Sequence, residues 1–229
     1  MYGRAFRAPN AYESYYADTV LVEPAPVQLK PEQIETHEVV FDQSLHSWLS
    51  FTVDGFWNRL TNLIDQLPDP STGFTYFANV GRNSGRGVEV ELEAKRASGL
   101  SGRASYTLAD ATDNLLHSRL ANSPLSTAKL NATLPLWHVG FAGAELLYTG
   151  AQRSYQDTRV SPWFLANLTM STRILWHGWQ FSASGYNLFD RAWAAPAGLE
   201  LRQAEVPQDG RTFRVKVTYA WHRERTPRP

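Results

Sequence analysis

The chain has 229 residues, a length that suits one all-β domain or one and a half domains of ordinary size. Its 22 basic and 22 acidic side chains give a formal net charge of zero, which gives no support for a nucleic-acid or an anionic-lipid partner. Cysteine is absent and no apolar run exceeds four residues, which excludes a disulfide framework, a thiolate metal site and a transmembrane helix. A membrane β-barrel stays open, because each of its strands needs only about 9–11 alternating residues.

Alternation of apolar and polar residues with a period of two dominates the chain, and this pattern is typical of strands with two different faces. No segment has the spacing and caps of a helix. A partial strand is expected near 1–7. Full strands are predicted over 33–43, 47–65, 74–97, 101–111, 125–137, 139–152, 161–173, 178–189 and 211–221.

The alternation is clearest in GVEVELEAK, residues 87–95. Three glutamates and a lysine share one face of this strand, opposite Val88, Val90, Leu92 and Ala94; they are Glu89, Glu91, Glu93 and Lys95. Three carboxylates on one face are costly to bury without partners, so this face is expected to be wet. In a barrel it would face the lumen.

The last predicted strand repeats the pattern in RTFRVKVTYAW, where Arg214, Lys216 and Thr218 lie opposite an apolar face. That apolar face consists of Phe213, Val215, Val217, Tyr219 and Trp221. Beyond it, residues 222–229 (HRERTPRP) are basic and rich in proline, and we expect them to form a disordered tail.

Short and long connections alternate along the chain. The short ones fall near 44–46, 98–100, 137–138 and 174–177, and the long ones at 14–32, 66–73, 112–124, 153–160 and 190–210. Five tryptophans lie beside a short turn or at the same end of the last strand: Trp48, Trp137, Trp176, Trp179 and Trp221. Short turns at one end of the barrel, long loops at the other end and a belt of aromatic residues are typical of outer-membrane barrels.

The alternative is a soluble β-sandwich, for example a lectin-like binding module, which also alternates apolar and polar positions. Sandwich strands usually have about 5–6 residues. The strands predicted here are longer, and their connections are sorted by length. Both features favour an all-β, antiparallel, up-and-down transmembrane barrel portion.

Seven segments, taken in order, resemble the C-terminal part of the barrel of TonB-dependent outer-membrane receptors. The segments are YGRAFRAPNAYESYY, LKPEQIETHEVVF, FTVDGFWNRLTNLI, YFANVGRNSGRGVEVELE, NSPLSTAKLNATLPL, YNLFDRAWAAP and PQDGRTFRVKVTYAW. The sixth segment has Trp193 where the family usually has tyrosine. The resemblance extends over residues 1–221.

The resemblance implies a place in the bacterial outer membrane, surrounded by lipid, and the uptake of a scarce nutrient such as a ferric siderophore or cobalamin. It also implies two protein partners: TonB, which grips the N-terminal region of these receptors, and the barrel-assembly machinery, which recognises their last strand. The final strand, from Phe213 to Trp221, matches that assembly signal.

The chain departs from the family pattern at its start. Such receptors have about 22 strands around a plugged lumen. The TonB box, the plug, the first half of the barrel and a signal peptide are all missing from this sequence. We therefore expect about nine to ten strands, an incomplete barrel that does not transport on its own, and either a mis-started gene, a pseudogene or a genuine fragment.

No catalytic or cofactor motif is present in the sequence, so no enzyme activity, cofactor or metal site is predicted. The six histidines have no metal-ligand spacing. The glutamate row of residues 87–95 is better explained as a wet wall than as paired catalytic carboxylates. Candidate ligand-binding residues are exposed aromatics of the long connections, since binding residues concentrate on loops: Tyr15, Tyr16, Tyr155 and Trp193.

Overall fold

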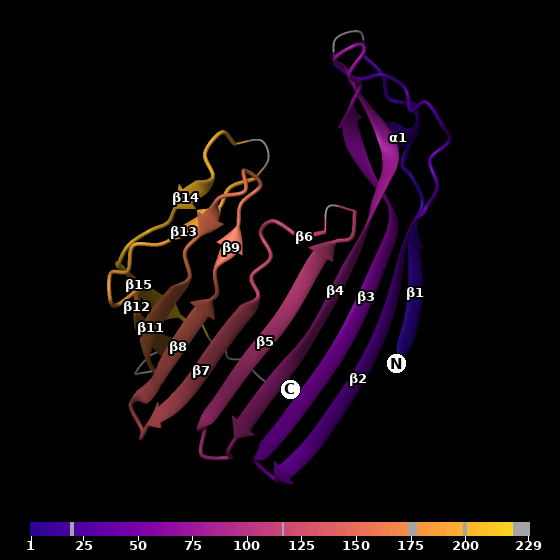
Figure 1. The fold of residues 1–229 in the computed structure, drawn as a ribbon. Helices are drawn as coiled ribbons and strands as arrows, with labels where there is room; N and C mark the ends of the chain where they lie inside the picture. The colour runs from indigo at the N-terminus through magenta and orange to yellow at the C-terminus, as the bar shows by residue number, and fades with distance from the viewer. Residues whose placement is uncertain (19–20, 116, 174–177, 199–200, 222–229) are drawn as a thin grey trace, which may run out of the picture. The chain divides into compact units, whose positions relative to one another are not determined.

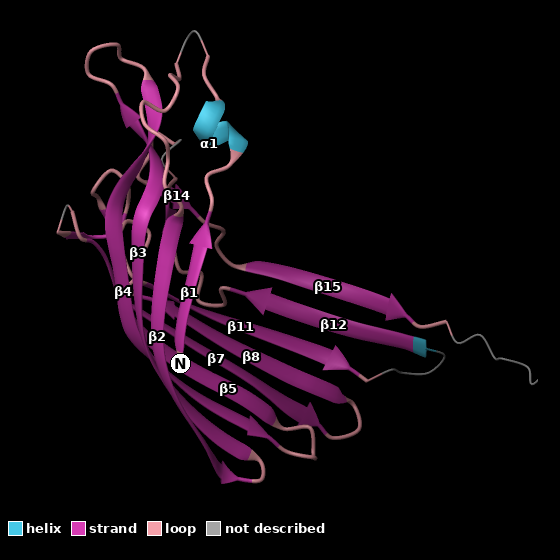
Figure 2. Cartoon of the chain, turned by 90° about the vertical axis from the view of Figure 1, so that its right-hand side faces the viewer, coloured by secondary structure: helices cyan, strands magenta, loops and turns pink. Residues whose placement is uncertain are grey.

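A computed structural model describes residues 1–18, 21–115, 117–173, 178–198 and 201–221 (Figure 1). Among the described residues, the regular secondary structure is almost all strand, and α1 is a short α-helix (Figure 2). The elements are β1 (Tyr2–Arg7), α1 (Ala11–Tyr15), β2 (Glu32–His46), β3 (Leu49–Pro68), β4 (Thr75–Lys95), β5 (Ser101–Asp113), β6 (Ser118–Arg119), β7 (Ser126–Leu136), β8 (Gly140–Thr149), β9 (Gln152–Arg153), β10 (Arg159–Val160), β11 (Trp163–Thr172), β12 (Trp179–Tyr186), β13 (Ala194–Pro196), β14 (Glu205–Pro207) and β15 (Thr212–Tyr219). No helix in these ranges has the length and apolar content needed to cross a membrane.

Eleven strands form one sheet in the order β1-β2-β3-β4-β5-β7-β8-β11-β12-β15, with β6 attached to β5. Strands that follow one another along the chain are neighbours, and the pairs from β5 to β15 are antiparallel. Within the described residues no pairing joins β1 to β15, so each is an edge strand. The predicted antiparallel, up-and-down sheet is therefore confirmed, and a single long sheet replaces the sandwich considered as the alternative.

The chain divides into two compact units. Unit 1 consists of residues 1–40, 54–88 and 109–123, and unit 2 of residues 41–53, 89–108 and 124–229. The short turns between β2 and β3, β4 and β5, and β7 and β8 all belong to unit 2. The connection between β11 and β12, expected at 174–177 and containing Trp176, lies outside the described residues, as does the tail 222–229.

The strands of unit 2 have two chemically different faces because their registers align like with like. Arg103 pairs with Asn131, Asn131 with Glu145, and Glu145 with Asn167, whereas Ala104 pairs with Leu130. We call the first side the polar face; its side chains include Arg103, Ser105, Thr107, Lys129, Asn131, Thr133, Glu145, Asn167, Thr169, Ser184, Arg214 and Lys216.

The opposite side of the same strands is the apolar face. Its side chains include Tyr106, Leu108, Leu130, Leu134, Leu146, Tyr148, Phe164, Leu168, Met170, Phe181, Phe213, Val215, Val217 and Tyr219. Many of them are exposed, and Val215 keeps 76% of its surface accessible. A continuous exposed apolar surface of this kind marks contact with a membrane or another protein.

Aromatic side chains gather at the short-turn end of unit 2. The Arg96 guanidinium lies 4.2 Å from the centre of the Trp48 ring, and the Trp179 and Tyr219 rings are 4.8 Å apart. Trp137, at a positive φ of 46°, projects into solvent. Rings with an apolar body and a polar edge are enriched where a protein crosses from hydrocarbon to water.

Two local features differ from the sequence prediction, one in unit 1 and one at the turn between β2 and β3 in unit 2. A single helical turn, α1, interrupts the first long connection, where no helix was expected. β2 continues to His46, so the turn predicted at 44–46 lies at Ser47 and Trp48 instead. A five-residue helix is too short to show apolar periodicity, and alternation does not mark where a strand stops.

β8 and β11 approach one another closely at Gly140. A Cβ at Gly140 would overlap the main-chain oxygen of Ser171, whereas a Cβ at Gly143 would lie 3.9 Å from its nearest neighbour, the oxygen of Thr169. We expect Gly140→Ala to destabilise the fold by about 1–3 kcal/mol through overpacking. Gly143→Ala, the control on the same strand, should stay within about 0.5 kcal/mol. Thermal unfolding in detergent, followed by far-UV circular dichroism, measures both; equal losses would contradict the packing described.

Candidate functional site

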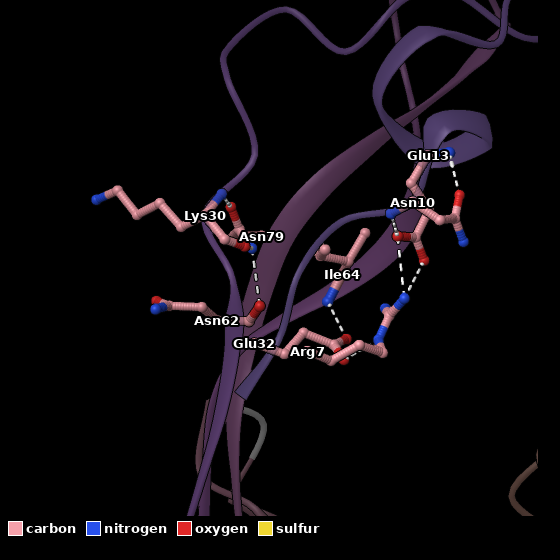
Figure 3. Close-up of polar contacts among 8 residues, drawn as sticks. All are labelled: Arg7, Asn10, Glu13, Lys30, Glu32, Asn62, Ile64 and Asn79. Atoms are coloured by element: carbon pink, nitrogen blue, oxygen red, sulfur yellow. Dashed lines mark hydrogen bonds and ion pairs between the residues drawn. The ribbon is translucent and has the colours of Figure 1, made fainter. Parts of the chain in front are cut away.

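The connection from β1 to β2, residues 8–31, carries the predicted aromatics Tyr15 and Tyr16, and an ion-pair cluster fixes its start (Figure 3). The Arg7 guanidinium bonds to the carboxylate of Glu32 and lies 2.9 Å from that of Glu13. The other carboxylate oxygen of Glu32 accepts the main-chain N–H of Ile64 at 2.9 Å. One arginine thus joins α1 to the first residue of β2, and Glu32 joins both to β3.

Glu13 also fixes the helix. The Asn10 side chain accepts the N–H of Glu13 at 2.8 Å, and the Glu13 carboxylate accepts the N–H of Asn10 at 2.9 Å. This reciprocal arrangement is a capping box, which satisfies two main-chain donors that a helix start leaves unpaired. The position of α1 therefore depends on side-chain contacts rather than on an apolar core.

Asn79 fixes the far end of the same connection (Figure 3). Its side-chain oxygen accepts the N–H of Lys30 at 2.7 Å, and its side-chain nitrogen donates to the carbonyls of Lys30 at 2.9 Å and Asn62 at 2.7 Å. Asn62 itself has a positive φ of 57°. Both ends of the connection are therefore tied to the strands of unit 1.

Between these two anchors the connection presents tyrosines. Tyr15 keeps 83% of its surface exposed at the end of α1. The Tyr16 ring stacks 4.3 Å from Tyr12, which meets the edge of Phe77 at 5.7 Å. The Tyr16 hydroxyl donates to Asp18 at 3.3 Å, and the negative charge of Asp18 raises the pKa of Tyr16 above its usual value. The sequence prediction missed Tyr12, which the fold places beside Tyr16, and Phe77, which it places beside Tyr12.

The other two predicted aromatics, Tyr155 and Trp193, belong to unit 2. Tyr155 is exposed in the turn between β9 and β10. The Trp193 ring lies 4.6 Å from that of Trp163, and its indole N–H donates to the carbonyl of Asp209 at 3.2 Å. Tyr15 and Tyr16 therefore share one connection of unit 1, whereas Tyr155 and Trp193 lie on two different connections of unit 2.

The acidic row of β4 meets partners from β5 that the sequence did not reveal. Arg103 lies 3.4 Å from the Glu91 carboxylate and 3.5 Å from that of Glu93. The Thr107 hydroxyl donates to Glu89 at 3.1 Å. Lys95, at the end of β4, donates its main-chain N–H to the carbonyl of Trp48 at 2.8 Å. These contacts place the row beside the polar face, and their exposed geometry resembles a hydrated wall rather than a catalytic pair.

The predicted assembly segment lies on β15 at the edge of the sheet. β15 pairs with β12 along its whole length, with Val215 opposite Ala183 and Val217 opposite Phe181. Phe213, Val215, Val217 and Tyr219 point to the apolar face, and Trp221 follows the strand. All five side chains are exposed. In the described part of the chain, no three histidine, aspartate or glutamate side chains are grouped so that they could hold a metal ion.

Comparison with known proteins places this geometry in a family. The family described as TonB dependent receptor-like, beta-barrel matches residues 1–188. The vitamin B12 transporter BtuB of Vibrio cholerae serotype O1 is 32% identical over 114 residues, which make up 49% of this chain and 17% of that transporter.

Solved receptors share the fold at low identity. The pyoverdine outer membrane receptor FpvA of Pseudomonas aeruginosa PAO1 superposes with a TM-score of 0.74 at 15% identity, over 96% of this chain and 33% of the receptor. The FrpB iron transporter of Neisseria meningitidis superposes with a TM-score of 0.75 at 13% identity, over 95% of this chain and 36% of the transporter. Together with the matched residues and the two-faced antiparallel sheet, these findings show that the chain belongs to the TonB-dependent receptor β-barrel family of outer-membrane proteins.

Proposed function

We propose that this chain forms barrel wall in an outer-membrane receptor that takes up a scarce nutrient, such as a ferric siderophore or cobalamin. The observation that carries the proposal is the two-faced sheet of a receptor-family chain. An exposed apolar face suits hydrocarbon, and an opposite face of charged and amide side chains suits a hydrated lumen. The similar proteins include a vitamin B12 transporter and an iron transporter, and this similarity supports uptake rather than catalysis.

The acidic row belongs to the lumen side in this proposal. Glu89, Glu91, Glu93 and Lys95 would face water inside the barrel, where the Arg103 ion pairs are solvated and contribute little to stability. Their role is to keep the wall polar. Energy for uptake would come from TonB, acting through the receptor's N-terminal region.

The connection 8–31 is our first candidate for ligand capture. Its tyrosines are exposed, yet both of its ends are anchored by Arg7 and Asn79. Anchored aromatic side chains lose little entropy when a ligand binds, so they are suited to recognition. Tyr155 and Trp193 are the corresponding candidates in unit 2.

Uptake by the intact receptor tests the proposal. In a strain without its own receptors, the complete receptor that contains this chain should import radiolabelled cyanocobalamin or an iron-loaded siderophore, and loss of TonB should abolish that import. Tyr15→Ala should weaken import about fivefold at limiting ligand, since one aromatic contact contributes about 1 kcal/mol. Tyr2→Ala is the matched control, because Tyr2 is another exposed tyrosine, which packs on His37 at the other end of β1.

Import that continues without TonB, or failure to import both cyanocobalamin and the iron-loaded siderophore, would contradict the proposed function. Equal effects of Tyr15→Ala and Tyr2→Ala would remove the connection 8–31 from ligand capture while leaving the transporter assignment intact.

We also infer that β15 is the segment that the barrel-assembly machinery recognises. Recognition by strand addition needs an accessible main-chain edge and side chains at alternate positions. β15 is an edge strand of the sheet and exposes Phe213, Val215, Val217 and Tyr219 at alternate positions.

Combined Tyr219→Ala and Trp221→Ala substitution should reduce the amount of receptor inserted in the outer membrane several-fold, because the apolar end of the signal is lost. Deletion of His222 to Pro229 should leave insertion unchanged. Quantitative immunoblotting of outer-membrane fractions measures both. Loss of insertion in the deletion but not in the double variant would show that the signal lies elsewhere.

A further inference from the structure

A hollow of about 380 Å³ lies on unit 2 where β8 ends and β11 begins, next to the connection that follows β12. Five apolar or aromatic residues and one arginine line it: Tyr148, Pro162, Trp163, Phe164, Phe189 and Arg191. None of them belongs to the tyrosine cluster of unit 1 or to the acidic row.

The hollow continues the apolar face. Tyr148 and Phe164 are cross-strand partners, and the pairs that follow them on this face are Leu146 with Ala166 and Ala144 with Leu168. β8 has 10 residues. At about 3.4 Å per residue and a tilt of about 40°, a strand of this length spans the apolar band of about 25 Å that such barrels have. The hollow therefore lies at the edge of the band next to the long connections, opposite the edge with the short turns.

Phe189 and Arg191 are held in place rather than carried on a loose loop. Asn187, which is only 4% exposed, accepts the N–H of Arg191 and donates to its carbonyl, both at 2.9 Å. The N–H of Asn187 in turn donates to the Asn167 side chain of β11 at 2.8 Å. The segment 187–191 is thus fixed to the sheet, and yet Phe189 keeps 72% of its surface exposed. A large apolar side chain kept exposed in a fixed position suits a partner that is itself apolar.

The Arg191 guanidinium makes no hydrogen bond or ion pair with any described residue, although its main chain is bonded twice. Nearby, the Arg211 guanidinium already has the Leu188 carbonyl and Asp190 as partners. An unpaired guanidinium beside an apolar hollow can bind a phosphate with two parallel hydrogen bonds, a geometry that lysine does not offer.

We propose that this hollow binds a phosphate-bearing lipid of the leaflet that faces the long connections. One acyl chain lies against Tyr148, Phe164 and Phe189, and a headgroup phosphate bonds to Arg191. A lipid fits better than a soluble anion because the hollow opens from the apolar face, where hydrocarbon rather than water supplies the ligand.

Lipid A binding to the intact protein, purified in an uncharged detergent and followed by native mass spectrometry, tests the site. Arg191→Gln should weaken binding of lipid A about tenfold, the loss expected for one charge-assisted contact. Phe189→Ala should also weaken it. Arg202→Gln is the matched control, an exposed arginine of the same connection that does not line the hollow. Since Phe189 and Arg191 are both exposed, neither variant should lower thermal stability.

Two further ligands identify the group that is recognised. Removing the phosphates from lipid A should weaken its binding to wild type at least as much as Arg191→Gln weakens the binding of intact lipid A. Inorganic phosphate should not compete with lipid A. Equal binding of lipid A by wild type and Arg191→Gln, an equal loss in Arg202→Gln, or displacement by inorganic phosphate would each overturn the proposal.

Discussion

The alternation of side chains across hydrogen-bonded strands is the constraint on which this structure depends. In hydrocarbon every main-chain N–H and carbonyl needs a partner, and a sheet supplies these partners between neighbouring strands. The registers from β5 to β15 then decide which side chains stand together. They bring Arg103, Asn131, Glu145 and Asn167 into one polar row and keep the apolar residues on the other side.

A sheet whose apolar side chains stay exposed has little core with which to hold its connections. Only six apolar residues of the described chain are buried. Polar side chains take over this role: Arg7 and Asn79 fix the connection 8–31, and Asn187 fixes the segment that carries Phe189 and Arg191. Asn79 and Asn187 act alike, since each bonds a connection's main-chain N–H and carbonyl through one amide. The same kind of polar contact therefore holds the connection that carries Tyr15 and Tyr16 and the segment that lines the hollow of unit 2.

The strands could be predicted because alternation is local, and each predicted strand overlaps an observed one. The contacts of the sites could not, because they depend on register and on distant pairs. Arg103 meets Glu91 and Glu93 only through the alignment of β4 with β5, and Asn79 meets Lys30 across 49 positions. One missed feature had a readable signal: Asn10 followed three residues later by Glu13 is a capping-box pattern that indicates α1. Nothing local in the sequence indicates that Arg191 lines an apolar hollow.

Cysteine accessibility on β15 tests the two-faced wall most directly, because the chain contains no cysteine of its own. Val215 and Arg214 are neighbours whose side chains lie on opposite faces of one strand. In intact outer membranes, we expect a membrane-impermeant, water-soluble maleimide to label Arg214→Cys from the lumen and to leave Val215→Cys unlabelled until detergent dissolves the membrane. Labelling of Val215→Cys before detergent, with Arg214→Cys protected, would contradict the assignment of the apolar face to lipid.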